Sequence, residues 1–188
     1  MLRWLRPSRI VEIGSGWSSA LILDTVDRYL TGDERLAFVE PHPERLKSLL
    51  RTADDGRVTI HEQDVQRVPM ELFTGLGPGD LLFIDSSHVV TVGSDVPYLI
   101  GEVLPLLPSG VVVHVHDIFW PFEILRQWFE QGRLWAEPYM WRAFLSSNSD
   151  WEVLFLNHWF VNARRSIVRE HLPRMLTSGT GALWLRRR

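Results

Sequence analysis

Two carboxylates and two histidines follow apolar segments in the middle of the sequence, and these residue types could do chemistry together. Asp85 ends one apolar segment and is followed by His88, while His116 and Asp117 end a later one. An imidazole with an unperturbed pKa of about 6.5, or a carboxylate, can act as general acid or base near neutral pH. We therefore take Asp117, His88 and His116 as candidate catalytic residues.

The same side chains could instead hold a divalent cation. Two carboxylates, Asp85 and Asp117, offer the oxygen ligands that Mg²⁺ prefers. Adding the imidazole of His116 would favour Mn²⁺, Fe²⁺ or Zn²⁺. The alternatives are that Asp85 only lines a cofactor site and that the nearby His114 is a hydrogen-bonded core histidine.

A glycine-rich turn lies close to the start of the chain. Gly14 and Gly16 follow a short apolar segment and open a stretch with helical spacing. Glycines in such a turn let the backbone bend sharply and approach a ligand closely. Glu12 lies just before the turn, where a charge is costly to bury unless it is paired or faces a ligand. The turn predicts a cofactor loop.

Two further acids fit an adenosine-type cofactor. Glu40 ends the second apolar segment, where an acid can accept hydrogen bonds from both ribose hydroxyls. Asp64 follows the third segment and could accept from the adenine amino group, beside the backbone of Val65. Ser19 replaces the third glycine of the dinucleotide fingerprint, which serves helix packing beside a pyrophosphate. Its absence argues against NAD and for a cofactor without a pyrophosphate.

These residues must be positioned by strands that alternate with helices. We expect strands at residues 10–13, 36–40, 58–61, 80–85, 110–117, 151–156 and 182–185, and helices at 18–30, 44–51, 96–107 and 163–176. Continuous apolar strands alternating with helices indicate a parallel sheet covered on both faces.

Taken in order, these motifs resemble the class I S-adenosylmethionine-dependent methyltransferases, in the small-molecule O-methyltransferase-like branch. The matching segments are 11–16, 38–41, 63–65, 83–88 and 110–117. The resemblance implies an α/β, three-layer Rossmann-like fold with a mostly parallel seven-stranded sheet and a reversed last strand. The implied strand order is 3-2-1-4-5-7-6.

The resemblance also implies roles for individual residues. S-adenosyl-L-methionine would lie over the carboxyl ends of the strands, and an acceptor hydroxyl of a small molecule or glycan would lie near Asp85, His88 and Asp117. Similar enzymes use Mg²⁺ or another divalent metal there, but this sequence has Ile118 where catechol-type relatives carry a second carboxylate or an amide. The implied cofactor-binding residues are Glu12, Gly14, Gly16, Ser18, Ser19, Glu40, Asp64, Val65 and Asp85.

Residues 118–150 are rich in aromatic side chains and form the expected acceptor-side segment. An apolar wall there would keep water away from the reacting groups. Trp120, Phe122 and Tyr139 are the candidate acceptor-pocket residues. The alternative is core packing together with a homodimer surface, because exposed aromatics mark interfaces.

The bulk composition narrows the function further. The 188 residues are 45% apolar with a net charge of −3, which favours one folded domain spanning 1–188 and does not suggest a nucleic-acid binder. The absence of cysteine excludes disulfides and thiolate sites and is compatible with a cytoplasmic protein. No apolar run reaches the roughly 18 residues of a membrane span. Because a strand begins almost at once, we expect an N-terminal helix to be missing.

Two other functions stay open at this point. An NAD-type oxidoreductase or epimerase could use the same architecture, although the third glycine is absent and the single lysine, Lys47, forms no Tyr-x-x-x-Lys pair. A non-catalytic module could keep the cofactor site and use its aromatic surface to bind a partner.

Overall fold

A computed structural model describes residues 1–188, and its centre is one sheet of seven strands in the order β3-β2-β1-β4-β5-β7-β6. Strands β1 to β5 are parallel, and β7 runs antiparallel to both β5 and β6. The predicted fold, strand order and reversed last strand are therefore confirmed. The strands are β1 (Arg9–Ile13), β2 (Arg35–Val39), β3 (Val58–His61), β4 (Leu81–Ile84), β5 (Val112–His116), β6 (Trp151–Leu156) and β7 (Ala182–Arg187).

Nine α-helices surround the sheet. They are α1 (Leu2–Leu5), α2 (Trp17–Tyr29), α3 (Glu44–Leu49), α4 (Glu71–Thr74), α5 (Asp95–Tyr98), α6 (Arg126–Glu130), α7 (Glu137–Ser146), α8 (Asn157–Ala163) and α9 (Arg165–His171). Four 3₁₀ turns, η1 (Thr52–Asp54), η2 (Val65–Arg67), η4 (Leu104–Leu106) and η5 (Pro173–Leu176), and one π-helical turn, η3 (Leu99–Val103), complete the chain. None of the helices has the length and apolar character needed to cross a bilayer.

Two predicted helices differ from the observed ones. The segment 96–107 is α5 followed by η3 and η4, because Pro105 has no N–H to continue a regular helix. The prediction of one helix at 163–176 was wrong in its start and continuity. Strand β6 runs directly into α8 at Asn157, and Arg164 separates α8 from α9.

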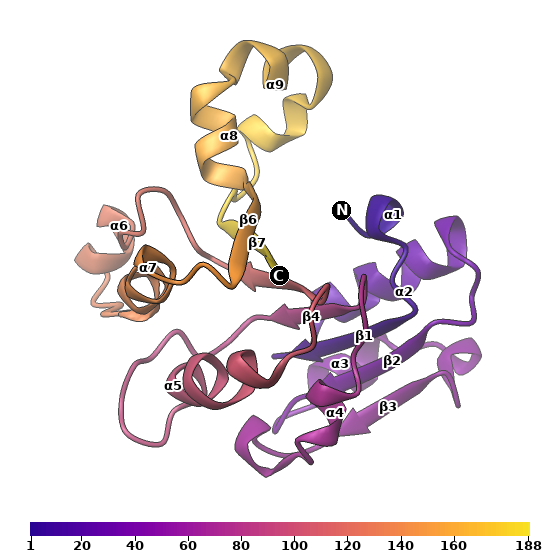
Figure 1. Cartoon of the computed structure of the whole chain (residues 1–188). Helices are drawn as coiled ribbons and strands as arrows, with labels where there is room; N and C mark the ends of the chain where they lie inside the picture. The colour runs from indigo at the N-terminus through magenta and orange to yellow at the C-terminus, as the bar shows by residue number, and fades with distance from the viewer.

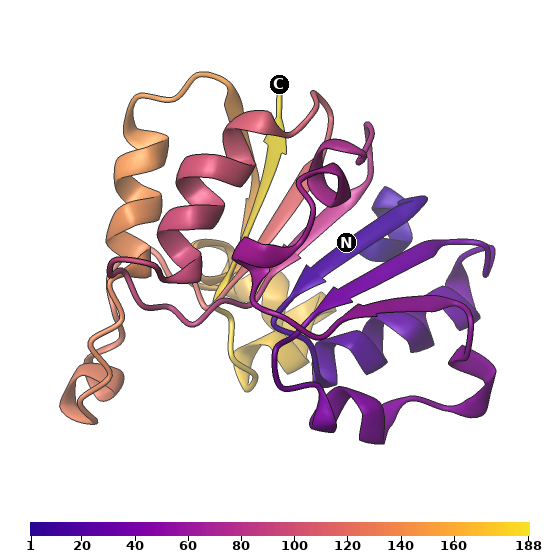
Figure 2. The same ribbon diagram turned by 90° about the horizontal axis from the view of Figure 1, so that it is seen from below.

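Side chains alternate between the two faces of the sheet and build two cores. Val11 and Ile13 of β1 belong to a core of 24 buried residues, while Ile10 belongs to a smaller core of ten. Figures 1 and 2 show α5 and α7 on one face and α2 and α3 on the other. These are the three layers that the continuous apolar strands predicted.

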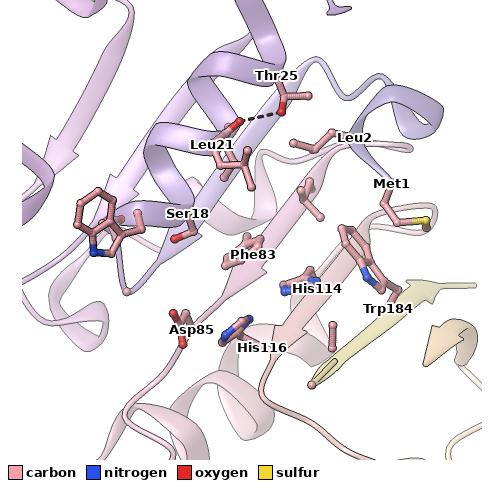
Figure 3. Close-up of a pocket in the computed structure, with 18 of the residues that line it drawn as sticks. Met1, Leu2, Ser18, Leu21, Thr25, Phe83, Asp85, His114, His116 and Trp184 are labelled. Carbon is pink, nitrogen blue, oxygen red and sulfur yellow. Dashed lines mark hydrogen bonds between the residues drawn. The ribbon is translucent and has the colours of Figure 1, made fainter. Parts of the chain in front are cut away.

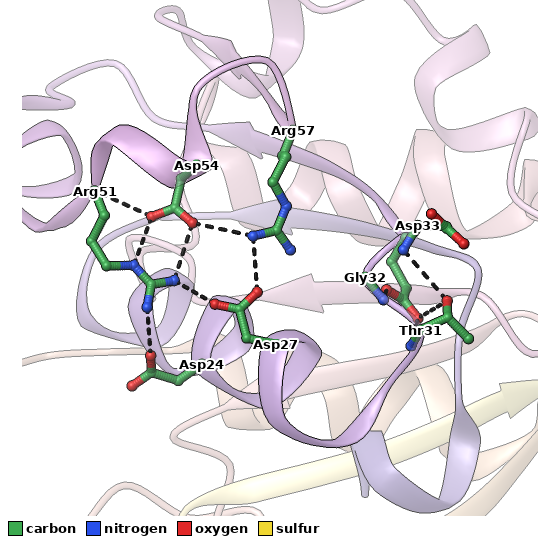
Figure 4. A network of polar contacts seen from close by, with 9 residues as sticks. Asp24, Asp27, Thr31, Gly32, Asp33, Arg51, Asp54 and Arg57 are labelled. Atoms are coloured by element: carbon green, nitrogen blue, oxygen red, sulfur yellow. Dashed lines mark hydrogen bonds and ion pairs between the residues drawn. The ribbon is translucent and has the colours of Figure 1, made fainter.

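A charged network fastens α2 to the chain between α3 and β3 (Figure 4). The guanidinium of Arg51 pairs with Asp24, Asp27 and Asp54, and Arg57 pairs with Asp27 and Asp54. The side chain of Asp54 is almost fully buried, and its hydrogen bond with Arg51 holds its pKa below the ordinary value. The network fixes the outer part of the sheet, where β2 and β3 lie.

The parallel strands bring the candidate residues to one edge of the sheet. The N–H of Gly14 donates to Val39 O at 3.0 Å, and the N–H of Asp85 donates to Ile13 O at 2.8 Å. The loops after β1, β2, β4 and β5 therefore leave the sheet side by side, which is where ligands bind in open α/β folds.

Candidate active site

Two cavities meet at the carboxyl edge of the sheet. The first has a volume of about 940 Å³ and lies between α2 and the strands β4, β5 and β7. The second, of about 800 Å³, lies among the loops that follow β1 to β4. Gly14, Glu40, Asp85 and Ser86 line both. The two cavities thus share a wall, and together they offer an elongated site.

The glycine-rich turn has the shape that the sequence predicted. Gly14 has a φ of +79°, and a Cβ on it would lie 1.9 Å from the carbonyl oxygen of Asp85. Only glycine fits, because the loops after β1 and β4 touch there. Gly16 and Ser18 line the first cavity.

Glu12 and Ser19 support this turn from beneath. The N–H of Gly16 donates to Ser19 Oγ at 2.9 Å, and the Ser19 hydroxyl in turn donates to the buried carboxyl of Glu12. Burial raises the pKa of Glu12 to about 7, and the hydrogen bonds it accepts lower it only in part. Neither side chain lines either cavity. The structure thus gives them a supporting position, and their predicted contact with the cofactor stays a prediction.

The predicted ribose and adenine residues all line the second cavity. The carboxylate of Glu40 accepts from Ser15 N at 3.1 Å and from His42 N at 2.9 Å. Asp64 and Val65 line the same cavity. The three residues that the sequence assigned to an adenosine group are therefore brought to one cavity.

The candidate catalytic residues gather around Asp85. Nε2 of His88 lies 3.7 Å from Asp85 Oδ1, and Nε2 of His116 lies 3.4 Å from Asp117 Oδ1. Asp85 and His116 lie next to one another at one end of the first cavity (Figure 3). Burial raises the pKa of Asp85, and the nearby imidazoles of His116 and His88 oppose that rise. Asp117, with a φ of +56°, has the backbone strain often found at functional sites.

The sequence analysis missed Glu137, which the structure places in this group. Glu137 begins α7 and is 1% exposed. Its carboxylate accepts from Ser86 Oγ at 2.9 Å and Trp141 Nε1 at 3.0 Å, and lies 2.6 Å from His88 Nδ1. Burial alone would lower the pKa of His88, but the hydrogen bond and charge of Glu137 raise it. An acid at the start of an aromatic helix is a weak signal in sequence, since acids are common in a first helical turn.

The predicted metal ligands are close together but do not form a metal centre as they stand. No three His, Asp or Glu side chains are arranged to hold an ion. Asp85, His116 and Asp117 therefore do not fit a metal in the arrangement observed.

The three predicted acceptor-pocket residues of the aromatic segment have different surroundings. Trp120 is half exposed, Phe122 packs on the larger core, and the hydroxyl of Tyr139 donates to Glu123 Oε2 at 2.7 Å. None of the three predicted acceptor-pocket residues lines either cavity. Their predicted role remains without structural support.

Other aromatic side chains form the floor of the first cavity. Phe83, His114 and Trp184 lie in a row along the sheet, opposite Ser18 and Leu21 of α2 (Figure 3). The ring of His114 stacks on Phe83 at 4.1 Å and meets Trp184 edge-on at 4.4 Å. Burial lowers the pKa of His114 to about 3. It is a core histidine, as expected, but the expectation that it is hydrogen-bonded was wrong, because neither ring nitrogen has a partner.

The chain also matches a family model. Residues 11–118, which contain the turn and the strands that end in Glu40, Asp85 and Asp117, match a family described as a methyltransferase domain. The chain belongs to this family. The class I methyltransferase resemblance is confirmed by the match and by the strand order. No curated protein sequence matches the chain.

Solved methyltransferase structures share the fold. The O-methyltransferase TomG from Streptomyces achromogenes, in complex with SAM, superposes with a TM-score of 0.61 at 21% identity, over 99% of this chain and 75% of TomG. An O-methyltransferase from Bacillus cereus in complex with SAH gives 0.57 at 13% identity, over 100% of this chain and 77% of that one. A CmcI structure described as Mg-SAM gives 0.54 at 20% identity, over 100% and 68%. At these identities the comparison shows a common fold.

Proposed function

We propose that this methyltransferase transfers the methyl group of S-adenosyl-L-methionine to a hydroxyl of a small molecule or glycan. The observation that carries the proposal is the shared wall of the two cavities. Glu40 stands in that wall together with Gly14 and Asp85. A cofactor with an adenosine end and an amino-acid end needs such a two-part site with an acid near its ribose.

The residues present fit this cofactor. Asp64 and Val65 would hold the adenine, and Glu40 the ribose. The Oγ of Ser15 and the Oδ1 of Asn157 belong to residues lining the first cavity and are buried without a partner, as expected of groups that bind a polar ligand. The solved structures that contain SAM or SAH agree with this choice of cofactor. When bound, the cofactor supplies an activated methyl group on a sulfonium.

The chain's own task is then to align the acceptor and to take its proton. Alignment contributes most when the leaving group is already activated. His116 ends β5 next to Asp85, and Oδ1 of the following Asp117 lies 3.4 Å from His116 Nε2. We assign the proton transfer to this pair.

A metal has no role in this proposal, because the side chains of Asp85, His116 and Asp117 do not converge on one point. Assays after exhaustive chelation test this point. Loss of activity that Mn²⁺ or Mg²⁺ restores would show that Asp85, His116 and Asp117 rearrange around an ion.

Calorimetric titration tests the cofactor. S-adenosylhomocysteine should bind, and NADH should not. Tight NADH binding without S-adenosylhomocysteine binding would instead support the oxidoreductase alternative.

The Asp117→Ala variant tests catalysis against the non-catalytic alternative. Methyl transfer from labelled S-adenosylmethionine to a panel of phenols and sugars should stop in this variant, while S-adenosylhomocysteine still binds. Undiminished transfer by Asp117→Ala would remove the role assigned to that residue.

A further inference from the structure

Glu137 is a buried acid that lies outside the residues assigned to cofactor or acceptor. It comes from α7, far along the chain from the loop after β4, yet its carboxylate meets that loop at Ser86 and His88. A buried carboxylate is costly unless several donors pair with it. Ser86, His88 and Trp141 fill this role, so the arrangement is specific in its geometry.

Three features fix the imidazole of His88. Its Nδ1 lies 2.6 Å from Glu137 Oε2, the ring of Trp135 lies over it at a centroid distance of 4.4 Å, and its backbone is in the left-handed region with a φ of +61°. Non-glycine residues adopt that conformation only where the surroundings enforce it. With its ring fixed, His88 directs Nε2 toward Asp85, at 3.7 Å from Oδ1.

The residues that Glu137 contacts directly and through His88 lie at the cavities. Ser86, held directly by Glu137, and Asp85, reached through His88, line the shared wall of the two cavities. We infer that Glu137 is a positioning residue of the site, which fixes His88 so that Asp85 and Ser86 keep their places in that wall. The logic is that of an outer group that orients an imidazole, which in turn orients a functional side chain.

This inference rests on the proposed function and adds a positioning residue to the proposed site. Helix α7 belongs to the aromatic segment 118–150, which was expected to contact the acceptor. Through Glu137, this segment also determines the geometry of the cofactor-side wall.

Two variants of the full chain separate positioning from simple packing. Glu137→Gln keeps the shape and removes the charge that orients His88. His88→Asn keeps an amide nitrogen near the position of Nδ1, suits the left-handed backbone, and removes the Nε2 that faces Asp85. Both should bind S-adenosylhomocysteine about 10-fold more weakly than the wild type, the lower end of effects seen for outer orienting groups. Glu130→Gln, an exposed acid of α6 in the same segment, should bind it unchanged.

A spectroscopic measurement on the unmodified chain covers the case in which Glu137→Gln fails to fold. With ¹⁵N-labelled histidine, the Nδ1 proton of His88 should show the downfield resonance of a strong hydrogen bond to a carboxylate. Adding S-adenosylhomocysteine should shift the Nε2 resonance of the same ring, because Asp85 lies in the cavity wall.

The outcomes distinguish the two proposals. If the wild type binds no S-adenosylhomocysteine, the proposed function is wrong and this inference falls with it. If the wild type binds and His88→Asn binds equally well, or the His88 resonances ignore the ligand, the proposed function stands and the positioning role of Glu137 is overturned.

Discussion

At the residue scale, the site depends on acids with different surroundings. Glu40 accepts two backbone N–H groups and still faces both cavities, whereas Glu12 is sealed beneath the turn. The first is therefore available to a ligand, and the second acts on the stability of the fold. Replacing Glu40 should therefore affect ligand binding, and replacing Glu12 should affect stability.

Replacing Glu40 should weaken cofactor binding. A hydrogen bond to a charged group contributes about 1.5–3 kcal/mol, so Glu40→Ala should raise the Kd for S-adenosylhomocysteine about 10- to 100-fold. Calorimetry measures the affinity, and a melting curve checks that the loops still fold. Glu44→Ala, on the exposed side of α3, is the matched control. Equal affinities for Glu40→Ala and the control would exclude the ribose role.

Replacing Glu12 should stabilise the protein at alkaline pH. The folded pKa of about 7 exceeds the ordinary value of 4.5, so the folded state holds a proton that the unfolded state releases, and stability declines as the pH rises between these values. Glu12→Gln removes this pH-dependent loss of stability. Its gain in the free energy of unfolding should be about 3 kcal/mol at pH 8 and below about 1 kcal/mol at pH 5. Urea unfolding at both pH values measures it, and a gain independent of pH would contradict the burial argument.

At the element scale, β7 supports the residues that follow β5. Its preceding loop ends at Gly181, whose carbonyl accepts from Asp117 N at 2.8 Å. A Cβ on Gly181 would lie 2.4 Å from the Phe119 ring and 2.8 Å from Asp117 Cα. The reversed last strand thus contributes to the position of a proposed catalytic residue without any reactive side chain of its own.

A methyl group on Gly181 should therefore displace Asp117. We expect Gly181→Ala to reduce methyl transfer by about 100-fold, since a displacement of about 1 Å can cost that much. Gly101→Ala in η3 is the control, because Gly101 lies outside both cavities and a Cβ on it would meet no atom within 4 Å. Rates measured with labelled cofactor decide. Similar rates in both variants would mean that the strand relaxes without moving Asp117.

At the scale of the whole molecule, two cores of unequal size lie on either side of one sheet, and the first cavity replaces part of the smaller one. Its floor includes His114, which is buried, neutral and without a hydrogen-bond partner. The charged network around Asp54 holds the other end of the same face. Both features require particular protonation states, so the fold as a whole should be sensitive to acid.

Acid should destabilise the wild type more than His114→Phe. The folded pKa of His114, about 3, lies below the ordinary value of 6.5, so its contribution to stability is fully present above pH 6.5 and is lost as the pH falls below that value. At pH 4.5 the loss should be about 2–3 kcal/mol. Asp54, whose pKa is lowered by its hydrogen bond with Arg51, adds a further loss only at still lower pH. Melting temperatures at pH 7.5, 6 and 4.5 for both proteins measure the effect. Parallel declines would exclude His114 as a cause.

The sequence by itself determined the order of the seven strands and the turn that begins at Gly14, because apolar runs, glycines and strand-end acids are local signals. The parallel topology then brought Glu40, Asp85 and Asp117 to one edge, as expected from the ends of their strands. Only the tertiary structure decided that Glu137 meets His88, and that Phe83, His114 and Trp184, rather than Trp120, Phe122 and Tyr139, line the first cavity. These contacts join segments far apart in the chain, and they depend on how α7 and β7 pack against the sheet, which no local pattern specifies.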